Sequence, residues 1–247
     1  MLAQSLVRGT RYHAEPLYRA VHDFLLAGWP RVALYPALFA CSDEVNAETA
    51  GFRTAVLGQY GGFFTTRMIG SQVFYQQIQV ALAQGHSSNF FEVNAHVGEI
   101  VEGSARRYGQ LVGRDGVARA TCGALGHVLE DLRTRIDEPS ISQTVDGELY
   151  LDFLGTLRLR LLPHLERILS APDPVLAITC VNLEVQVQEL TRQLRRALAK
   201  GLAAAPVFVV GTISFNHAGS LDEGSVEHFA VLEGPEPGAE ARLLAEP

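Results

Sequence analysis

The sequence predicts an α/β fold with a mostly parallel central sheet and flanking helices. Strand-like segments alternate along the chain with segments of helical period, which is the order of repeated βαβ units. Two runs, 32–40 (VALYPALFA) and 206–215 (PVFVVGTISF), are almost continuously apolar, as expected for strands buried on both faces of a parallel sheet. A chain of 247 residues, 47% of them hydrophobic, can bury one sizeable core. We therefore expect a single domain.

The first expected element is an amphipathic helix over residues 11–28. Leu17, Val21 and Leu25 recur at helical spacing, and Gly28 ends the pattern. The apolar run 32–40 then forms the first strand. Pro36 within this run cannot donate to a sheet ladder, which favours an edge position or an irregularity at that point.

The segment between this strand and residue 98 should contain two helices and a second strand. We expect, in order, a helix over 45–58, a Gly-rich loop over 61–70, a helix over 71–84, a loop at 86–89 and an alternating strand over 90–97.

The second half of the chain is expected to be mostly helical before its late strands. The expected elements are a polar exposed loop over 106–115, a helix over 123–136, a turn-rich segment over 137–147, helical stretches over 149–169 and 174–200, the buried strand over 206–215 and a short strand over 226–232. These elements divide the single domain, 1–247, into an N-terminal helical arm (1–28), a catalytic core (29–232) and a loose tail (233–247).

Charge and composition exclude several classes of partner. The formal net charge is −7, and no segment clusters Lys and Arg, so we expect neither nucleic acid nor an anionic membrane surface as the main partner. No apolar stretch has the length of a membrane span or of a signal-peptide core. The three cysteines are an odd number spread over a long chain, unlike a disulfide-stapled secreted domain. We expect a cytoplasmic protein with reduced thiols.

Three reactive side chains are expected near the ends of elements on the ligand-binding edge of the sheet. Cys41 closes the first strand, His96 lies near the end of another, and Cys122 stands where a helix begins. Two thiolates and one imidazole form a catalytic zinc set, which leaves one coordination position open. Their long separations match no short zinc motif. Two core thiols and a hydrogen-bonded strand histidine therefore remain the alternative.

Asp43 follows Cys41 by two residues, so in an extended chain both side chains lie on the same side. A carboxylate there can accept a hydrogen bond from a water on the metal or occupy the fourth position itself. The alternative is an N-cap of the following helix, a role that Asp fills well. The third cysteine, Cys180, falls inside a predicted helix and is expected to fill space in the core.

The motifs around these residues resemble the limiting-CO2-inducible B/C protein family, the theta-class carbonic anhydrases, which are similar in fold to the beta class. They occur in the order of that family: Cys41-Ser42-Asp43-Glu44, the Gly-rich segment 61–70, Gly85-His86-Ser87-Ser88, Asn94-Ala95-His96-Val97 and Thr121-Cys122-Gly123-Ala124-Leu125. The later segment 209–217 also resembles a late strand of the family. The resemblance covers roughly residues 29–232.

The resemblance implies a beta-carbonic-anhydrase-like fold and a homodimer. It also implies that Cys41, His96 and Cys122 bind Zn2+, and that the enzyme interconverts CO2 and bicarbonate by zinc-hydroxide attack. Asp43 would control the fourth position. His86, in a loop on the active edge, is a candidate for moving protons, although a histidine merely exposed to water is the plainer interpretation.

One departure from the beta class concerns the partner of the aspartate. Beta-type enzymes pair that aspartate with an arginine two residues later, but Val45 stands here. Arg67 and Arg53 are the nearest substitutes, and Arg67 is favoured because it lies in the Gly-rich segment. Their plainer interpretation is as solvated or structural charges.

Two other functions remain open at this stage. The first is a non-catalytic zinc-binding scaffold, or a partner subunit of a CO2-concentrating or bicarbonate-handling complex. The second is a cysteine hydrolase with Cys41 or Cys122 as nucleophile and His96 as base, which requires a free thiol. A tightly held zinc ion would exclude the hydrolase, and a CO2 hydration assay would separate the enzyme from the scaffold.

Overall fold

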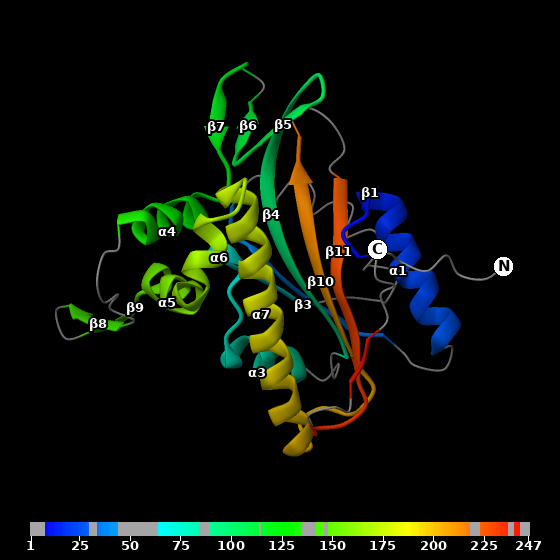
Figure 1. Ribbon diagram of the computed structural model, residues 1–247. Coiled ribbons are helices and arrows are strands. Elements are labelled where there is room, and N and C mark those ends of the chain that lie inside the picture. Colours follow the sequence, from blue (N-terminus) through cyan, green and yellow to red (C-terminus); the bar gives the residue numbers. More distant parts are fainter. Residues whose placement is uncertain are drawn as a thin grey trace.

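The computed structural model describes residues 8–29, 34–43, 64–83, 89–113, 115–134, 142–145, 148–217, 223–236 and 240–242. Within these ranges an eight-stranded sheet forms the centre of the molecule, and its main path runs β1-β11-β10-β4-β2-β3 (Figure 1). The strands are β1 (Arg11–His13), β2 (Pro36–Cys41), β3 (Phe64–Met68), β4 (Phe90–Glu102), β5 (Ala105–Tyr108), β10 (Val207–Asn216), β11 (Glu223–Leu232) and β12 (Glu240–Arg242).

The centre of the sheet is parallel, and its additions are antiparallel. β10, β4, β2 and β3 run parallel to one another. β11 joins β10 antiparallel, β1 and β12 pair with β11, and β5 folds back on β4. Two small hairpins lie outside this sheet, β6 (Gln110–Val112) with β7 (Ala118–Ala120), and β8 (Ser142–Val145) with β9 (Glu148–Leu151). The predicted α/β class with a mostly parallel sheet is confirmed.

Helices cover both faces of the sheet. They are α1 (Ala14–Gly28), α3 (Tyr75–Ala83), α4 (Gly123–Thr134), α5 (Phe153–Leu161), α6 (Leu165–Leu169) and α7 (Pro174–Ala199), with short 3-10 turns η2 (Ile69–Ser71) and η3 (Leu162–His164). α7 begins sharply because the Asp173 carboxylate accepts the Leu176 N–H and Pro174 occupies the first turn. In the described part of the chain, no helix is long and apolar enough to cross a bilayer.

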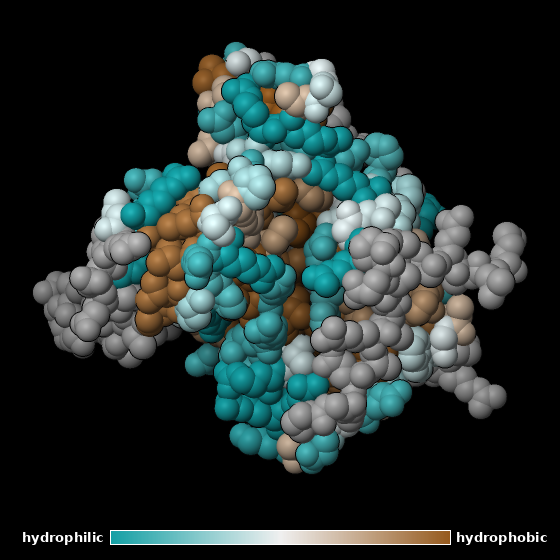
Figure 2. Space-filling model, in the orientation of Figure 1, coloured by the Kyte–Doolittle hydropathy of each residue, from teal (hydrophilic) through white to brown (hydrophobic). Residues whose placement is uncertain are grey.

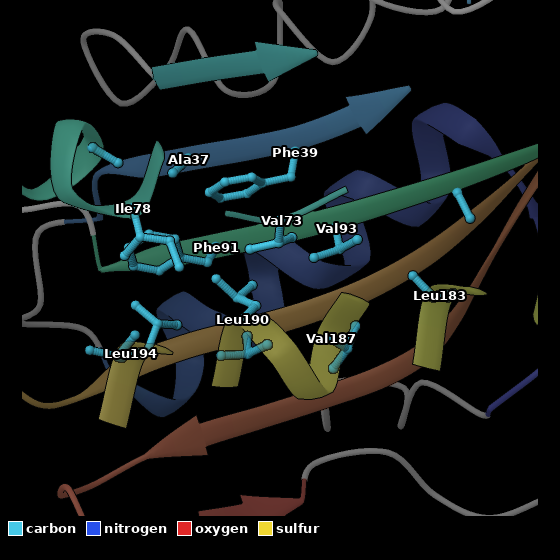
Figure 3. Packing of buried hydrophobic residues seen from close by; sticks show 14 of the residues in the cluster. Ala37, Phe39, Val73, Ile78, Phe91, Val93, Leu183, Val187, Leu190 and Leu194 are labelled. Atoms are coloured by element: carbon cyan, nitrogen blue, oxygen red, sulfur yellow. The ribbon is translucent and has the colours of Figure 1, made fainter. Parts of the chain in front are cut away.

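The alternation of side chains along β4 divides the core in two. Phe91 and Val93 belong to the cluster on the α7 side of the sheet (Figure 3). The residues that α7 contributes to this cluster include Val187, Leu190 and Leu194. Phe90 belongs to the other cluster, which α1 covers. Both faces of the central strands are therefore buried, and this explains the almost continuous apolar runs in their sequences.

Several sequence-based expectations hold for the described residues. The helices expected over 11–28, 123–136 and 174–200 are present as α1, α4 and α7, and the strands expected over 90–97 and 206–215 are present as β4 and β10. β4 continues past the expected end, to Glu102, so His96 lies within the strand instead of near its end. The helix expected over 45–58 lies outside the described residues.

Other expectations were wrong, each for a physical reason. Pro36 does not mark an edge, because it is the first residue of β2, where a missing N–H is tolerated, and β2 lies between β4 and β3. Residues 64–68 form β3 instead of a loop, with the alternating exposure of a strand. The expected loop over 106–115 contains β6 and most of β5, two strands of three and four residues that are too short to leave a clear period in the sequence.

Some short strands were also missed. Residues 148–151, expected as the start of a helical stretch, form β9, and β8 lies within the segment expected to be turn-rich. β1 precedes α1 within the expected helix 11–28. β12 pairs with β11 within the segment expected to be a loose tail. Strands of three or four residues are too short to leave a clear period in the sequence. The division into arm, core and tail stays a prediction.

Candidate metal centre

The three expected ligand residues meet at one place in the fold. Cys41 is the last residue of β2, His96 lies in β4, and Cys122 immediately precedes α4. One potential ligand atom from each residue lies within 4.8 Å of the others, and all three side chains are buried. The neighbouring parallel strands β2 and β4 bring the first two together, and the turn before α4 adds the third.

The turn that carries Cys122 is held against β4. The Thr121 hydroxyl accepts a hydrogen bond from the Gly98 N–H at 2.6 Å, and the Thr121 N–H donates to the Gly109 carbonyl at 3.0 Å. A Cβ on Gly98 would overlap both Thr121 Oγ1 and the backbone of Gln110, so this close approach requires glycine. Cys122 itself has a φ of 51°, a strained backbone conformation for a residue with a side chain.

The Asp43 carboxylate lies against two of the ligand residues, Cys122 and His96. Its Oδ2 accepts a hydrogen bond from the Cys122 N–H at 2.8 Å and lies 3.9 Å from His96 Nε2. Its own backbone N–H bonds to Cys41 and stabilises the thiolate. The carboxylate therefore caps the amide at the start of a distant helix, and it lies beside the three ligand atoms. Residues 44–63 are outside the described ranges, so the alternative role of Asp43 as an N-cap of the next helix stays a prediction.

His96 is oriented by its other ring nitrogen. Its Nδ1 lies 3.0 Å from Asn216 Oδ1 at the end of β10. Its Nε2 is buried and has no hydrogen-bond partner within the described residues. A buried polar atom without such a partner is costly in a native protein. A metal ion bound at Nε2 would satisfy it.

The electrostatics of the cluster favour a cation. The pKa of Cys41 is lowered to about 4, chiefly because the Cys122 thiol donates a hydrogen bond to it, although burial opposes the charge. The same hydrogen bond, together with burial, raises the pKa of Cys122 well above that of a free thiol. Burial opposes charge on His96, but Cys41 and Asp43 outweigh it and raise the histidine pKa. Negative charge on Cys41 and Asp43 thus faces the buried nitrogen.

Of the other expected site residues, the structure describes Arg67, which is not part of this cluster. Arg67 lies on β3 opposite Ala40, and no contact joins it to Asp43 in the described part of the chain. His86 and Arg53 lie outside the described residues. The roles expected for these residues stay predictions. Cys180 is half-buried in α7, where burial raises its pKa to about 11, and it packs against the core as expected.

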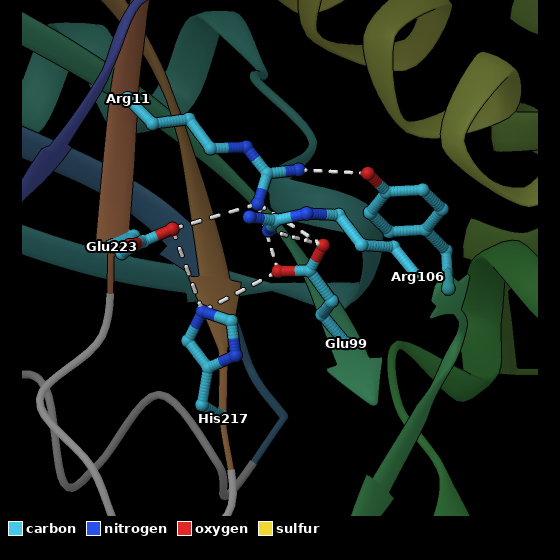
Figure 4. A network of polar contacts seen from close by, with 6 residues as sticks. Arg11, Glu99, Arg106, His217 and Glu223 are labelled. Atoms are coloured by element: carbon cyan, nitrogen blue, oxygen red, sulfur yellow. Dashed lines mark hydrogen bonds and ion pairs between the residues drawn. The ribbon is translucent and has the colours of Figure 1, made fainter. Parts of the chain in front are cut away.

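Sequence reasoning missed an ionic network beside the centre, further along β4. Arg11 donates to both oxygens of the buried Glu99 carboxylate, at 3.1 and 2.8 Å, and Arg106 donates to it at 2.9 Å (Figure 4). His217 and Glu223 complete the group. Glu99, His217 and Glu223 could by spacing hold a metal ion, but the Arg11 guanidinium already supplies positive charge there, 2.8 Å from Glu99 and 3.5 Å from Glu223.

A cavity of about 360 Å³ adjoins the metal centre at Cys122. It lies between α4, α7 and the β4 to β6 segment, and most of its walls are apolar, including Val97, Leu125 and Ile178. Its lining also includes Gly126, where a Cβ would meet nothing within 4 Å. Small uncharged molecules therefore have space beside Cys122.

Comparison with known proteins shows that this fold is similar to that of limiting CO2-inducible proteins. No protein-family model and no curated protein matches the sequence. The crystal structure of PtLCIB4, a homolog of the limiting CO2-inducible protein LCIB, aligns with a TM-score of 0.74 and 19% identity over 95% of both chains. LCIB itself aligns with a TM-score of 0.63 and 15% identity, over 95% of this chain and 98% of that one. The fold resemblance expected from the motifs is confirmed.

Proposed function

We propose that this chain is a zinc-dependent carbonic anhydrase that interconverts CO2 and bicarbonate. The observation that carries the proposal is the meeting of Cys41, His96 and Cys122, with ligand atoms within 4.8 Å, beside the Asp43 carboxylate. The structural neighbours are described as limiting CO2-inducible proteins or their homologs. CO2 is proposed as the substrate from the motif resemblance to theta-class carbonic anhydrases.

The donor set fits zinc. Two sulfur atoms and one imidazole nitrogen are ligands that zinc prefers, whereas calcium and magnesium take oxygen ligands. Two thiolates would balance the charge of the ion, and three protein ligands leave a position open for chemistry. A zinc ion bound there lowers the pKa of a coordinated water toward neutrality and so supplies a nucleophile for CO2.

The chain's own residues would orient the reactants. Asp43 would accept a hydrogen bond from the nucleophile and turn a lone pair toward the carbon of CO2. The Cys122 N–H holds Asp43 Oδ2 at 2.8 Å, so the carboxylate has a defined position for this task. The apolar cavity beside Cys122 would admit CO2, which is uncharged. The proposal also includes proton transfer by His86 and orientation of Asp43 by Arg67. The variants His86→Ala and Arg67→Ala would test these two roles separately.

The second candidate is a non-catalytic zinc-binding scaffold or partner subunit. The sequence favours it in one respect, because Val45 stands where the beta class has an arginine two residues after the aspartate. A homodimer in the cytoplasm is also proposed. Leu154, Leu159 and Leu162 are exposed on α5 and η3, within an apolar surface that a second copy could cover (Figure 2).

Metal analysis and a CO2 hydration assay test the proposal together. The purified chain should hold about one zinc ion and accelerate CO2 hydration in stopped-flow measurements. Asp43→Asn should keep the zinc and lose most of the turnover, whereas Asp115→Asn, at an exposed turn, should change neither. Zinc without hydration would support the scaffold. A chain without zinc would overturn both and leave the thiol hydrolase.

A further inference from the structure

Asn216 is placed to control how His96 presents its ring. It is the last residue of β10, it is only 1% exposed, and its Oδ1 lies 3.0 Å from His96 Nδ1. The parallel register of β10 with β4 places Asn216 opposite Gly98, two residues beyond His96. The contact therefore follows from the pairing of the two central strands.

An amide oxygen can only accept a hydrogen bond, so His96 must carry a proton on Nδ1 to bond with it. In the neutral ring the lone pair then lies on Nε2. This nitrogen is the buried atom without a hydrogen-bond partner among the described residues, and it faces Asp43 Oδ2 at 3.9 Å. The opposite tautomer would place a proton on Nε2, where it would block a metal ion.

We propose that Asn216 is a positioning residue that fixes the Nδ1–H form of His96 and thereby makes the three-residue cluster able to bind metal. The inference rests on the metal binding in the proposed function, but not on catalysis. Partners of this kind, which bond to the second nitrogen of a histidine ligand, commonly account for about 10- to 100-fold in metal affinity.

The chain on the far side of Asn216 is anchored as well. The next residue, His217, lies 3.4 Å from Glu99 Oε2, and two arginines hold that carboxylate (Figure 4). β10 is thus tied to β4 on both sides of Asn216, by strand pairing before it and by the Glu99 network after it. A positioning residue requires such support, because a side chain on a loose strand end would not hold the ring.

Three variants of the full chain separate positioning from general stability. Asn216→Leu removes the acceptor at similar volume, and Asn216→Asp keeps an oxygen acceptor. Asn94→Leu is the matched control, because Asn94 is an equally buried asparagine on β4 that bonds to Thr212 and Ser214. Zinc affinity would be measured by competition with a chelator. In the zinc-loaded chains, NMR would show which ring nitrogen of His96 carries the proton.

Asn216→Leu should bind zinc about 10- to 100-fold more weakly, and the Nδ1 proton of His96 in this variant should lose the chemical shift of a hydrogen-bonded N–H. Asn216→Asp should stay within a few fold of the wild type, and Asn94→Leu should lose stability but keep wild-type affinity. Wild-type affinity in Asn216→Leu, or metal bound at Nδ1 in the wild type, would overturn the inference. A wild-type chain that binds zinc without hydrating CO2 would overturn only the proposed enzyme, whereas one that binds no zinc would overturn both.

Discussion

Removing the Asp43 side chain should destabilise the metal-free protein as well as abolish activity. The carboxylate accepts the Cys122 N–H at 2.8 Å, and Cys122 is a buried residue at a strained turn. Alanine would leave that N–H without its partner. Hydrogen bonds to charged groups contribute about 1.5–3 kcal/mol. We therefore expect Asp43→Ala to lower the free energy of unfolding by about that amount.

Asparagine at position 43 provides the matched comparison. It keeps an oxygen acceptor for the Cys122 N–H but loses the negative charge, so its cost should be smaller, about 1 kcal/mol. Both variants should lose CO2 hydration, because neither offers a carboxylate. The two variants should therefore differ in their free energy of unfolding but show the same loss of CO2 hydration.

Urea unfolding of the metal-free chains would measure the difference. Trp29 is the chain's single tryptophan and packs edge-on against Phe208 of β10, so its fluorescence reports on the sheet, with circular dichroism as a second probe. If Asp43→Ala unfolded at the same urea concentration as the wild type, with the same slope, the bond to Cys122 would not hold the turn, and the reasoning would fail.

Three further predictions concern the turn, the ionic network and the metal. Gly98→Ala should lower both stability and zinc affinity, because its Cβ would overlap Thr121 Oγ1. Gly126→Ala is the control, because a Cβ there would meet nothing within 4 Å. In urea unfolding it should stabilise α4 by about 0.5–1 kcal/mol. Burial opposes charge on Glu99, but its two arginine partners lower its pKa. Its contribution to stability is then present above about pH 4.5 and is lost as the pH falls through the lowered pKa, so Glu99→Gln should flatten the acid side of a stability profile. Zinc at about 100 times its Kd should add about 2.7 kcal/mol to the free energy of unfolding, and a chelator should remove this gain; an unchanged melting temperature would contradict specific binding.

The sequence predicts the ligand set from the common direction of the parallel strands, although β4 continues past His96 to Glu102. Cys41 closes a strongly apolar run, and His96 lies in an alternating one, so a parallel sheet brings them toward the same edge. Cys122 could be assigned to the same site because it immediately precedes a segment with a clear helical period, which forms α4. The identity of the three residues thus depends on patterns that are local in sequence, together with the family resemblance.

The partners of these ligands depend on register, which the sequence does not reveal. Asn216 reaches His96 only because β10 pairs in parallel with β4, and Arg11 reaches Glu99 only because β1 joins the far side of β11. Each contact joins residues that are far apart in the sequence. No hydrophobic period and no motif spacing marks Asn216 or Arg11 as a partner. The sequence does offer two signals for Asn216: it is a polar residue at the end of an apolar strand, and it lies in the segment 209–217 that resembles a late strand of the family.

Asp43 shows that a residue beside the candidate metal site can also cap a backbone amide that the sequence did not indicate. The sequence allowed either a residue beside the metal or an N-cap of the following helix, which lies outside the described residues. The structure shows the carboxylate capping an amide, that of Cys122, and also lying 3.9 Å from His96 Nε2. The cap is therefore part of the site, because the same bond that satisfies the Cys122 N–H also fixes the carboxylate among the ligands. A substitution that tests the catalytic role must preserve this bond, and for that reason asparagine, and not alanine, is the informative variant for turnover.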